Sequence, residues 1–267
     1  MLELDKLYNG DCLELMNDIP DGTVDAVICD LPYGVLHRNN PNSGWDKCLP
    51  LDELWKHWLR IAKYNAPFIL FGQGMFTAEL MMSQPKLWKM NLIWQKNLAT
   101  GFLNANRMPM RCHEDIVIFY RKQPVYNPQM EYKGYPSHPR GNGKHREGNR
   151  CYEKYHNGNI YDSAHIKRVE PTADPNMRFP RSVLTFRKDR GKIILHPTQK
   201  PVDLLRWLIR TWSNEGDLIL DCCAGSGSTL VAAIQECRHF IGIEKNQEYY
   251  KLASSWVGKE SSQLSIF

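Results

Sequence analysis

The sequence predicts an α/β protein with a mostly parallel sheet, and two observations carry this prediction. First, apolar runs of strand length lie at Val24–Cys29, Leu218–Leu220 and Phe240–Ile243. Uninterrupted runs of this kind are typical of strands that are buried on both faces. Second, a segment of helical composition, Thr229–Ile234, follows one of these runs after a short turn. Buried strands that alternate with helices indicate a sheet covered by helices on both sides.

The same patterns predict the other elements of the sheet. Further strands are expected at Leu7–Cys12, Phe68–Phe71, Leu92–Trp94 and Ile116–Tyr120. Further helices are expected after Cys12, at Leu51–Tyr64 and at Val202–Trp212.

Length and composition limit the class of protein. With 267 residues, 42% of them hydrophobic, the chain is expected to form one sizeable domain or one domain with a large insertion. It has no basic segment followed by an apolar run at its start and no 18 consecutive apolar residues, so we expect a soluble cytoplasmic protein without membrane association. The eight cysteines show no CxxC spacing. They are expected to be reduced core thiols, and no metal site is predicted.

The positive charge is concentrated in the middle of the chain. Residues 133–192 contain 14 Lys or Arg and 6 Asp or Glu, a balance of +8, whereas the remainder has a balance of −3. Residues 126–192 are also rich in Gly, Pro, Asn and Tyr, with little periodicity. Basic residues interleaved with aromatic ones suit contacts with both phosphates and bases. We therefore expect a nucleic-acid recognition region here, with Arg140, Lys144, Arg146 and Arg150 contacting DNA; a flexible solvated loop is the alternative.

A glycine-rich turn after Asp221 is a candidate ligand site. Gly225 and Gly227 lie between the strand and the helix that follows it, where glycine permits close approach of the backbone to a ligand. The next strand ends in Glu244, whose carboxylate can accept hydrogen bonds from both hydroxyls of a ribose. The turn is neither the GxGxxG dinucleotide motif nor a P-loop. A nucleoside without phosphates is therefore the ligand that suits the site best.

A second candidate site is Asp30-Leu31-Pro32-Tyr33, which follows the predicted strand Val24–Cys29. The Asp30 carboxylate and the Leu31 carbonyl could each accept one N–H of an exocyclic amine on a base, which would direct the nitrogen lone pair at a methyl donor. Pro32 stiffens the turn, and the ring of Tyr33 offers a face for stacking an extruded base. An ordinary turn that ends a strand is the alternative interpretation.

These motifs together resemble those of the β group of S-adenosylmethionine-dependent DNA amino-methyltransferases. Asp30–Tyr33 resembles the (D/N/S)PP(Y/F/W) catalytic motif of that family, Asp221–Thr229 resembles its DPFxGSGTT cofactor motif, and His196–Pro201 matches its HPTQKP element. The order of the motifs, with the recognition region between them, is also that of the β group. The resemblance implies a Rossmann-like sheet of seven strands, mostly parallel, with the last strand antiparallel.

The resemblance also implies roles for individual residues. The implied catalytic residues are Asp30, Leu31, Pro32 and Tyr33. The implied cofactor-binding residues are Asp11, Asp30, Thr198, Lys200, Asp221, Gly225, Gly227 and Glu244. Asp11 would contact the adenine of the cofactor, Glu244 its ribose, and Asp221, Gly225 and Gly227 its methionine part. Leu31 replaces a proline of the catalytic motif, but the role implied there belongs to the backbone carbonyl, which leucine also supplies. The pair Cys222-Cys223 replaces a proline and an aromatic residue, so the shape of the cofactor pocket is open at these two positions.

The resemblance predicts transfer of a methyl group from S-adenosylmethionine to N6 of adenine in double-stranded DNA. Aspartate at position 30 favours adenine, because members that modify N4 of cytosine more often carry serine there. N4-cytosine methylation, N-methylation of RNA or of protein glutamine, and a non-catalytic DNA-binding module that keeps the fold are the alternatives.

The expected organisation is a catalytic part at residues 1–125, the recognition region at 126–192, a cofactor-binding part at 193–258 and a tail at 259–267. The tail ends in Gln263-Leu264-Ser265-Ile266-Phe267, which resembles the QL(S/D)LF motif that binds the bacterial sliding clamp. Gln263, Leu264 and Phe267 would make that contact, whereas packing of Phe267 on the protein's own sheet is the alternative. The sequence does not decide the oligomeric state and leaves a homodimer open.

Overall fold

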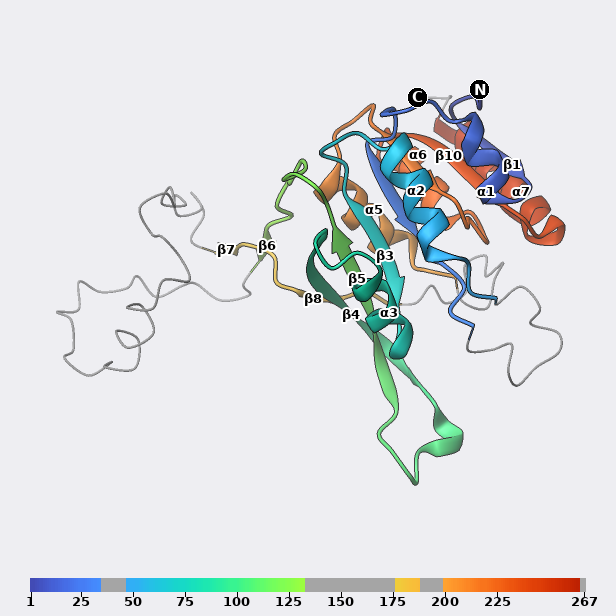
Figure 1. The fold of residues 1–267 in the computed structure, drawn as a ribbon. Coiled ribbons are helices and arrows are strands. Elements are labelled where there is room, and N and C mark those ends of the chain that lie inside the picture. The colour runs from blue at the N-terminus through green and yellow to red at the C-terminus, as the bar shows by residue number, and fades with distance from the viewer. Residues whose placement is uncertain (35–46, 133–175, 188–198, 265–267) are drawn as a thin grey trace. The chain divides into compact units, whose positions relative to one another are not determined.

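The computed structural model describes residues 1–34, 47–132, 176–187 and 199–264 (Figure 1). Their contacts divide the chain into two units, Met1–Asn127 with Arg181–Phe267, and Pro128–Pro180. In the described part of the second unit, strands β6 (Glu131–Tyr132) and β7 (Met177–Arg178) pair antiparallel, and Arg178 Nε donates a hydrogen bond to Glu131 Oε2 at 2.9 Å. The expected boundaries at 126–192 and 259 stay predictions.

The first unit is built on one sheet, which has eight strands among the described residues. In spatial order they are β1 (Lys6–Asn9), β10 (His239–Glu244), β9 (Leu218–Asp221), β2 (Ala26–Cys29), β3 (Phe68–Gly72), β5 (Arg111–Phe119), β4 (Trp88–Thr100) and β8 (Val183–Thr185). The first five pair in parallel, β5 runs antiparallel to both of its neighbours, and β8 is parallel to β4. The mostly parallel α/β sheet is confirmed. The expected number of seven strands is wrong by one, because β8 adds an edge strand within the segment assigned to the recognition region.

Helices cover both faces of the sheet, as the uninterrupted apolar strands require. They are α1 (Cys12–Leu15), α2 (Leu51–Ile61), α3 (Met75–Ser83), α5 (Val202–Trp212), α6 (Ser228–Gln235) and α7 (Gln247–Leu264), with short 3-10 turns η1 (Met16–Asp18) and η2 (Phe102–Asn104).

Alternation along the strands divides the core into two layers. In β2, Val27 and Cys29 belong to the cluster that contains Trp55 and Trp58 of α2. Ala26 and Ile28 belong to the cluster on the other face, with apolar residues of α5 and α6. Successive side chains of a strand point to opposite faces, so both faces of this central strand are buried. Rigid strands therefore fix the positions of the residues at their ends.

Two segments extend further than expected. Strands β4 and β5 continue past the expected Leu92–Trp94 and Ile116–Tyr120 into a long hairpin that projects from the sheet (Figure 1). Helix α7 continues into the expected tail, which starts at residue 259, and ends at Leu264, so Gln263 lies in its last turn. Phe267 lies outside the described residues, and the sliding-clamp contact stays a prediction. None of the helices in the described ranges has the length and hydropathy to cross a membrane.

Candidate functional site

A pocket of about 790 Å³ opens at the carboxyl ends of the parallel strands. Four acids predicted from the sequence line it: Asp11 after β1, Asp30 after β2, Asp221 at the end of β9 and Glu244 at the end of β10. They come together because the carboxyl ends of parallel strands share one edge of a sheet, where α/β proteins bind ligands. The volume suits a ligand of several hundred daltons.

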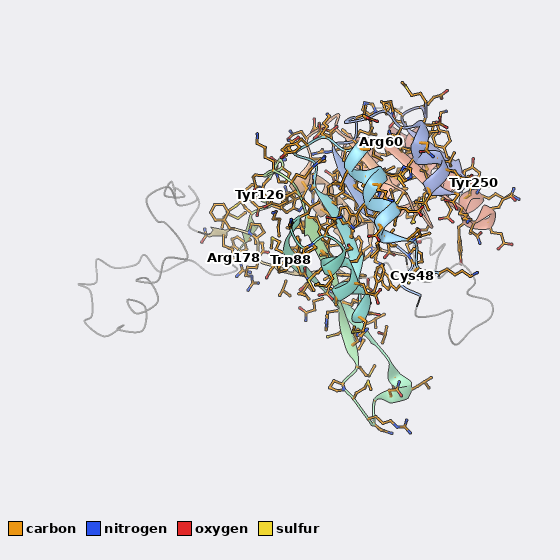
Figure 2. All side chains as sticks on the ribbon, in the orientation of Figure 1. Cys48, Arg60, Trp88, Tyr126, Arg178 and Tyr250 are labelled. Atoms are coloured by element: carbon orange, nitrogen blue, oxygen red, sulfur yellow. The ribbon has the colours of Figure 1, made fainter. Side chains whose placement is uncertain are left out.

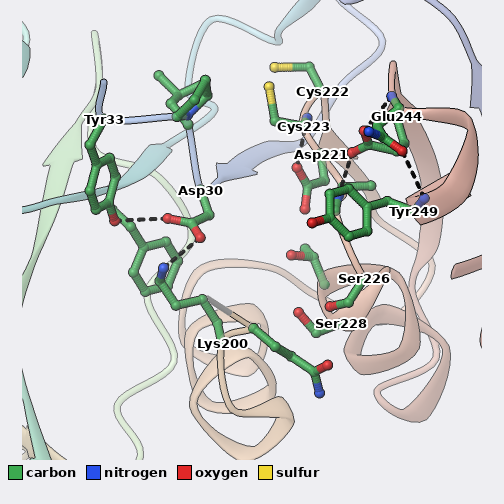
Figure 3. Close-up of a pocket in the computed structure, with 18 of the residues that line it drawn as sticks. Asp30, Tyr33, Lys200, Asp221, Cys222, Cys223, Ser226, Ser228, Glu244 and Tyr249 are labelled. Carbon is green, nitrogen blue, oxygen red and sulfur yellow. Dashed lines mark hydrogen bonds and ion pairs between the residues drawn. The ribbon is translucent and has the colours of Figure 1, made fainter. Parts of the chain in front are cut away.

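The pocket has two sides (Figure 3). Asp30, Tyr33 and Lys200 lie on one side, and Asp221, Ser226, Ser228, Glu244 and Tyr249 lie on the other. The first side carries the predicted catalytic motif, and the second carries most of the predicted cofactor residues. The pocket thus joins the two motifs, which are separated by nearly 200 residues of sequence.

Both oxygens of the Asp30 carboxylate accept hydrogen bonds within the chain. Tyr33 donates to Oδ1 at 2.8 Å, and Lys200 Nζ donates to Oδ2 at 2.5 Å. Leu31 and Pro32 follow directly and also line the pocket. The ring of Tyr33 packs against Phe76, with centroids 5.1 Å apart. Since a carboxylate can accept more than one bond at each oxygen, Asp30 keeps acceptor capacity for a donor that enters the pocket.

A buried ion network supports Asp30. Lys200 Nζ lies 3.3 Å from Glu114 Oε2, and Lys96 forms an ion pair with Glu114 Oε1. Burial alone would lower the pKa of Lys200, but Asp30 and Glu114 outweigh it and raise that pKa. Burial would likewise raise the pKa of Glu114, but the two lysines hold it below its usual value. Glu114 and Lys200 are therefore charged near neutral pH.

The pKa of Asp30 is set by opposing effects. Burial raises the pKa of its carboxyl group above the ordinary value, Lys200 opposes this shift, and the charge of Glu114 reinforces it. The lysine thus favours the ionised form, which is the form that accepts hydrogen bonds. Sequence reasoning assigned Lys200 to the cofactor pocket and did not predict this contact with Asp30.

Asp221 has no ion-pair partner among the described residues, and its side chain is buried. Its Oδ1 accepts the N–H of Cys223 at 3.1 Å. Burial raises the pKa of Asp221 to about 7, although a hydrogen bond from Thr229 opposes the shift. A cation placed beside this buried carboxyl group would favour its ionised form.

Glu244 and Asp11 are held by neighbouring backbone groups. Gly225 N donates to Glu244 Oε2 at 2.8 Å and Asn246 N donates to Oε1 at 2.7 Å. Asp11 Oδ1 accepts the N–H of Leu13 at 2.9 Å and so caps α1, while Oδ2 pairs with Lys245 at 2.8 Å. The Lys245 ammonium lowers the pKa of Asp11. These contacts fix both carboxylates at the edge of the pocket.

The two glycines of the turn have different environments. Gly225 lines the pocket and has a φ of +53°. Gly227 is not among the lining residues; its φ is +83°, and a Cβ there would lie 3.1 Å from the Cβ of Ala253 in α7. The need for glycine at 227 is therefore explained by its backbone conformation and by the close packing of α7.

Three thiols gather at the base of the pocket. The Sγ atoms of Cys12, Cys222 and Cys223 lie within 4.8 Å of one another, and Cys29 Sγ is 3.5 Å from Cys222 Sγ. Thiols are ligands that Zn²⁺ accepts, but structural zinc sites have four ligands, and the candidate group among the described residues has three. Cys12, Cys29 and Cys222 belong to the apolar core cluster, as expected for core thiols. Cys48, Cys112 and Cys237 are exposed, so the expectation is wrong for these three.

Some predicted residues lie outside the described ranges, namely Thr198 and the basic residues Arg140, Lys144, Arg146 and Arg150. Their roles stay predictions. Sequence reasoning missed several pocket residues: Phe71, Gln73, Thr100, Lys245, Asn246 and Tyr249. Their only sequence signal is that most of them follow predicted strand ends or belong to long strands.

The fold and the pocket define the chain as an α/β protein with a ligand-sized cavity, lined by carboxylates at the carboxyl ends of its parallel strands. A family model described as DNA methylase, of the N6/N4 methyltransferases, matches residues 24–255. The chain belongs to this family of DNA methylases.

Similar proteins extend over nearly the whole chain. The type II methyltransferase M1.MboII of Moraxella bovis is 26% identical, with 95% of this chain and 96% of that protein covered. M.HindIII of Haemophilus influenzae is 25% identical, with 97% of each covered. Among solved structures, the M1.HpyAVI–SAM complex has a TM-score of 0.61 at 20% identity, with 94% of this chain and 97% of that one covered. The cytosine-N4-specific PvuII methyltransferase has a TM-score of 0.64 at 15% identity, with 97% and 92% covered. At these identities the solved structures support the fold.

Proposed function

We propose that the chain transfers the methyl group of S-adenosylmethionine to N6 of an adenine that has rotated out of duplex DNA. The observation that carries this proposal is the Asp30 carboxylate, which lies in the pocket, is fixed by Tyr33 and Lys200, and retains acceptor capacity. In this role Asp30 accepts one N–H of the adenine amine, and the Leu31 carbonyl accepts the other.

The chemistry explains why two acceptors are needed. The lone pair of an exocyclic amine is delocalised into the base, so the planar amine is a poor nucleophile. Hydrogen bonds that favour a pyramidal nitrogen stabilise the transition state more than the ground state. The nitrogen then forms a bond to the methyl carbon while the bond from that carbon to the sulfonium sulfur breaks, and the nitrogen afterwards loses a proton.

The acids on the other side of the pocket fit S-adenosylmethionine. Asp221 is a buried carboxyl group with no cation beside it among the described residues, and the ammonium of the methionine part would supply one. Glu244 is fixed through two backbone N–H groups, and its remaining acceptor capacity suits ribose hydroxyls. Asp11 lies nearby for the adenine of the cofactor. Lys200 supports Asp30 in this scheme, which revises the role implied by the resemblance.

The pKa of Asp221 predicts that cofactor binding releases protons. With a pKa of about 7 in the empty pocket, most Asp221 carboxyl groups are protonated at pH 6. The ammonium of S-adenosylmethionine favours the ionised form, so binding at pH 6 should release nearly one proton, and affinity should rise as the pH approaches 7. Calorimetric titration at pH 6 in two buffers of different ionisation enthalpy measures this release.

The matched control is Asp221→Asn, which keeps the shape of the side chain but cannot ionise. It should bind S-adenosylmethionine more weakly and with no buffer-dependent enthalpy. Equal apparent binding enthalpies of the wild-type protein in the two buffers would remove Asp221 from the ammonium site.

The choice of adenine is tested by the product. After incubation of unmethylated genomic DNA with S-adenosylmethionine and the full chain, the DNA is digested to nucleosides and analysed by mass spectrometry. We expect N6-methyldeoxyadenosine. If N4-methyldeoxycytidine formed instead, the choice of base would be wrong and the chemistry of the amine site would stand. Absence of both products would contradict methyl transfer to an exocyclic amine of DNA.

A further inference from the structure

The hairpin of β4 and β5 carries apolar side chains at its far end, where contact with water is greatest. Phe102 and Leu103, in the turn η2, are 78% and 97% exposed. Leu98 and Met108 beside them are also exposed. Figure 2 shows the side chains of this end projecting away from the rest of the described chain. Large apolar residues grouped at an exposed tip indicate a contact surface.

The charge around this tip favours a polyanion as the partner. Residues 97–113 contain Arg107 and Arg111 and no Asp or Glu. Both arginines are exposed, and neither forms an ion pair with a carboxylate in the parts of the chain that the structure covers. An apolar tip flanked by arginines and amides, without carboxylates, suits the bases and phosphates of DNA.

The hairpin is also continuous with the pocket. Lys96 and Thr100 of β4 line the pocket, and Thr100 pairs with Arg111 of β5. Phe102 is two residues beyond Thr100, and two residues span at most about 7 Å. A base that enters the pocket therefore passes close to the start of the tip.

We propose that Phe102 and Leu103 insert into the DNA duplex beside the target base and fill the space that it leaves when it rotates into the pocket. Arg107 and Arg111 contact the adjacent phosphates. Rotation of a base breaks its stacking on both neighbours, and apolar side chains inserted between base steps replace part of that contact. This proposal rests on the proposed function, since it requires a DNA base in the pocket.

A second copy of the chain fits the tip less well. Two tips that met symmetrically would bring Arg107 and Arg111 of both chains together, and neither hairpin end offers a carboxylate to compensate. Like charges at such a contact oppose association. A dimer contact is therefore an alternative outcome of the test.

The first test is the double variant Phe102→Ala, Leu103→Ala, assayed for methylation of unmethylated duplex DNA at saturating S-adenosylmethionine. We expect a rate at least about tenfold lower, from the loss of contact with the neighbouring bases, with unchanged cofactor affinity and thermal unfolding. The control is Tyr64→Ala, which removes an aromatic side chain that is 66% exposed. Tyr64 lies near the bridge of Val24 with Ala62, at the amino end of β2, whereas the pocket lies at the carboxyl end of that strand. It should keep the wild-type rate.

The second test places the photoreactive residue p-benzoylphenylalanine at position 102 or, as control, at position 64. Irradiation with labelled duplex DNA should attach DNA to the protein only from position 102. In addition, Arg107→Ala with Arg111→Ala should reduce the slope of log affinity for DNA against log salt by about 2, since each phosphate contact contributes about 0.9.

The outcomes separate this inference from the proposed function. If the wild-type protein methylates DNA but the double variant is equally fast, or position 102 attaches to a second protein chain instead of DNA, insertion is wrong and the methyltransferase assignment stands. If the wild-type protein produces no methylated nucleoside, the proposed function fails, and the inference fails with it.

Discussion

Asp30→Ala is expected to lower the rate of methyl transfer by at least about 10²–10³-fold, the loss typical when a hydrogen bond to the reacting group is removed in the transition state. The affinity for S-adenosylmethionine should change little, because the bond from Asp30 is to the amine of the base. Single-turnover methylation of DNA gives the rate, and calorimetric titration gives the affinity.

Asp25→Ala is the matched control for this variant. Asp25 and Asp30 flank the same strand, β2, and both pair with a lysine, since Lys63 Nζ lies 2.6 Å from Asp25 Oδ1. Asp25 does not line the pocket, so its replacement should leave the rate per folded molecule unchanged. Turnover close to wild type in Asp30→Ala would contradict the role of Asp30 as acceptor.

Lys200→Met should destabilise the protein strongly. The Lys200 side chain is 5% exposed and contacts both Asp30 and Glu114. Removing one partner of a buried ion pair typically costs about 3–5 kcal/mol, because a charge remains buried without compensation. In this variant Glu114 remains paired with Lys96, and the Asp30 side chain is 25% exposed. We therefore expect the free energy of unfolding to fall by about 3 kcal/mol, the low end of that range. Chemical denaturation at pH 8 measures the change in the free energy of unfolding.

The same variant has a pH signature. In the wild type, Lys200 opposes the rise in the pKa of Asp30 that burial causes. Without the lysine this pKa should rise further, so the acid limb of the rate against pH should move to higher pH. The destabilisation should be largest where Asp30 is ionised and should shrink as the pH falls and the carboxyl group binds a proton.

Lys63→Met is the control for Lys200→Met. Lys63 is 45% exposed in its ion pair, and exposed pairs contribute about 1 kcal/mol or less. Its replacement should cost little stability and leave the pH profile in place. An equally small effect of Lys200→Met, with an unshifted acid limb, would show that Lys200 does not support Asp30.

Much of the fold could be predicted because each buried parallel strand can be recognised from its own run of apolar residues. Strand β2 and helix α5 are short segments whose own apolar pattern identifies them, and α5 begins and ends at the expected residues Val202 and Trp212. Strand β8 was missed because three residues with one buried side chain have no such pattern. The end of α7 was missed because Gly258 and the polar residues after it resemble a linker in composition.

The candidate site could be predicted only in part, for a related physical reason. Asp30, Asp221 and Glu244 were predicted because each follows a strand, and parallel strands bring their ends together. The contact between Lys200 and Asp30 joins residues 170 positions apart, and the bond between them depends on how α5 packs against the sheet. The hairpin tip was missed because its apolar residues lie among Gly, Asn and Pro, which indicate a turn but not how far it projects.

The most direct test of the account is a crystal structure of the chain with duplex DNA that contains its target site and with sinefungin, an unreactive analogue of S-adenosylmethionine. The account predicts an adenine rotated into the pocket, with its N6 within about 3 Å of an Asp30 carboxylate oxygen and of the Leu31 carbonyl oxygen. The analogue should lie on the opposite side, with its ammonium at Asp221 and its ribose hydroxyls at Glu244. An analogue bound elsewhere, or a target base whose amine does not contact Asp30, would contradict the account.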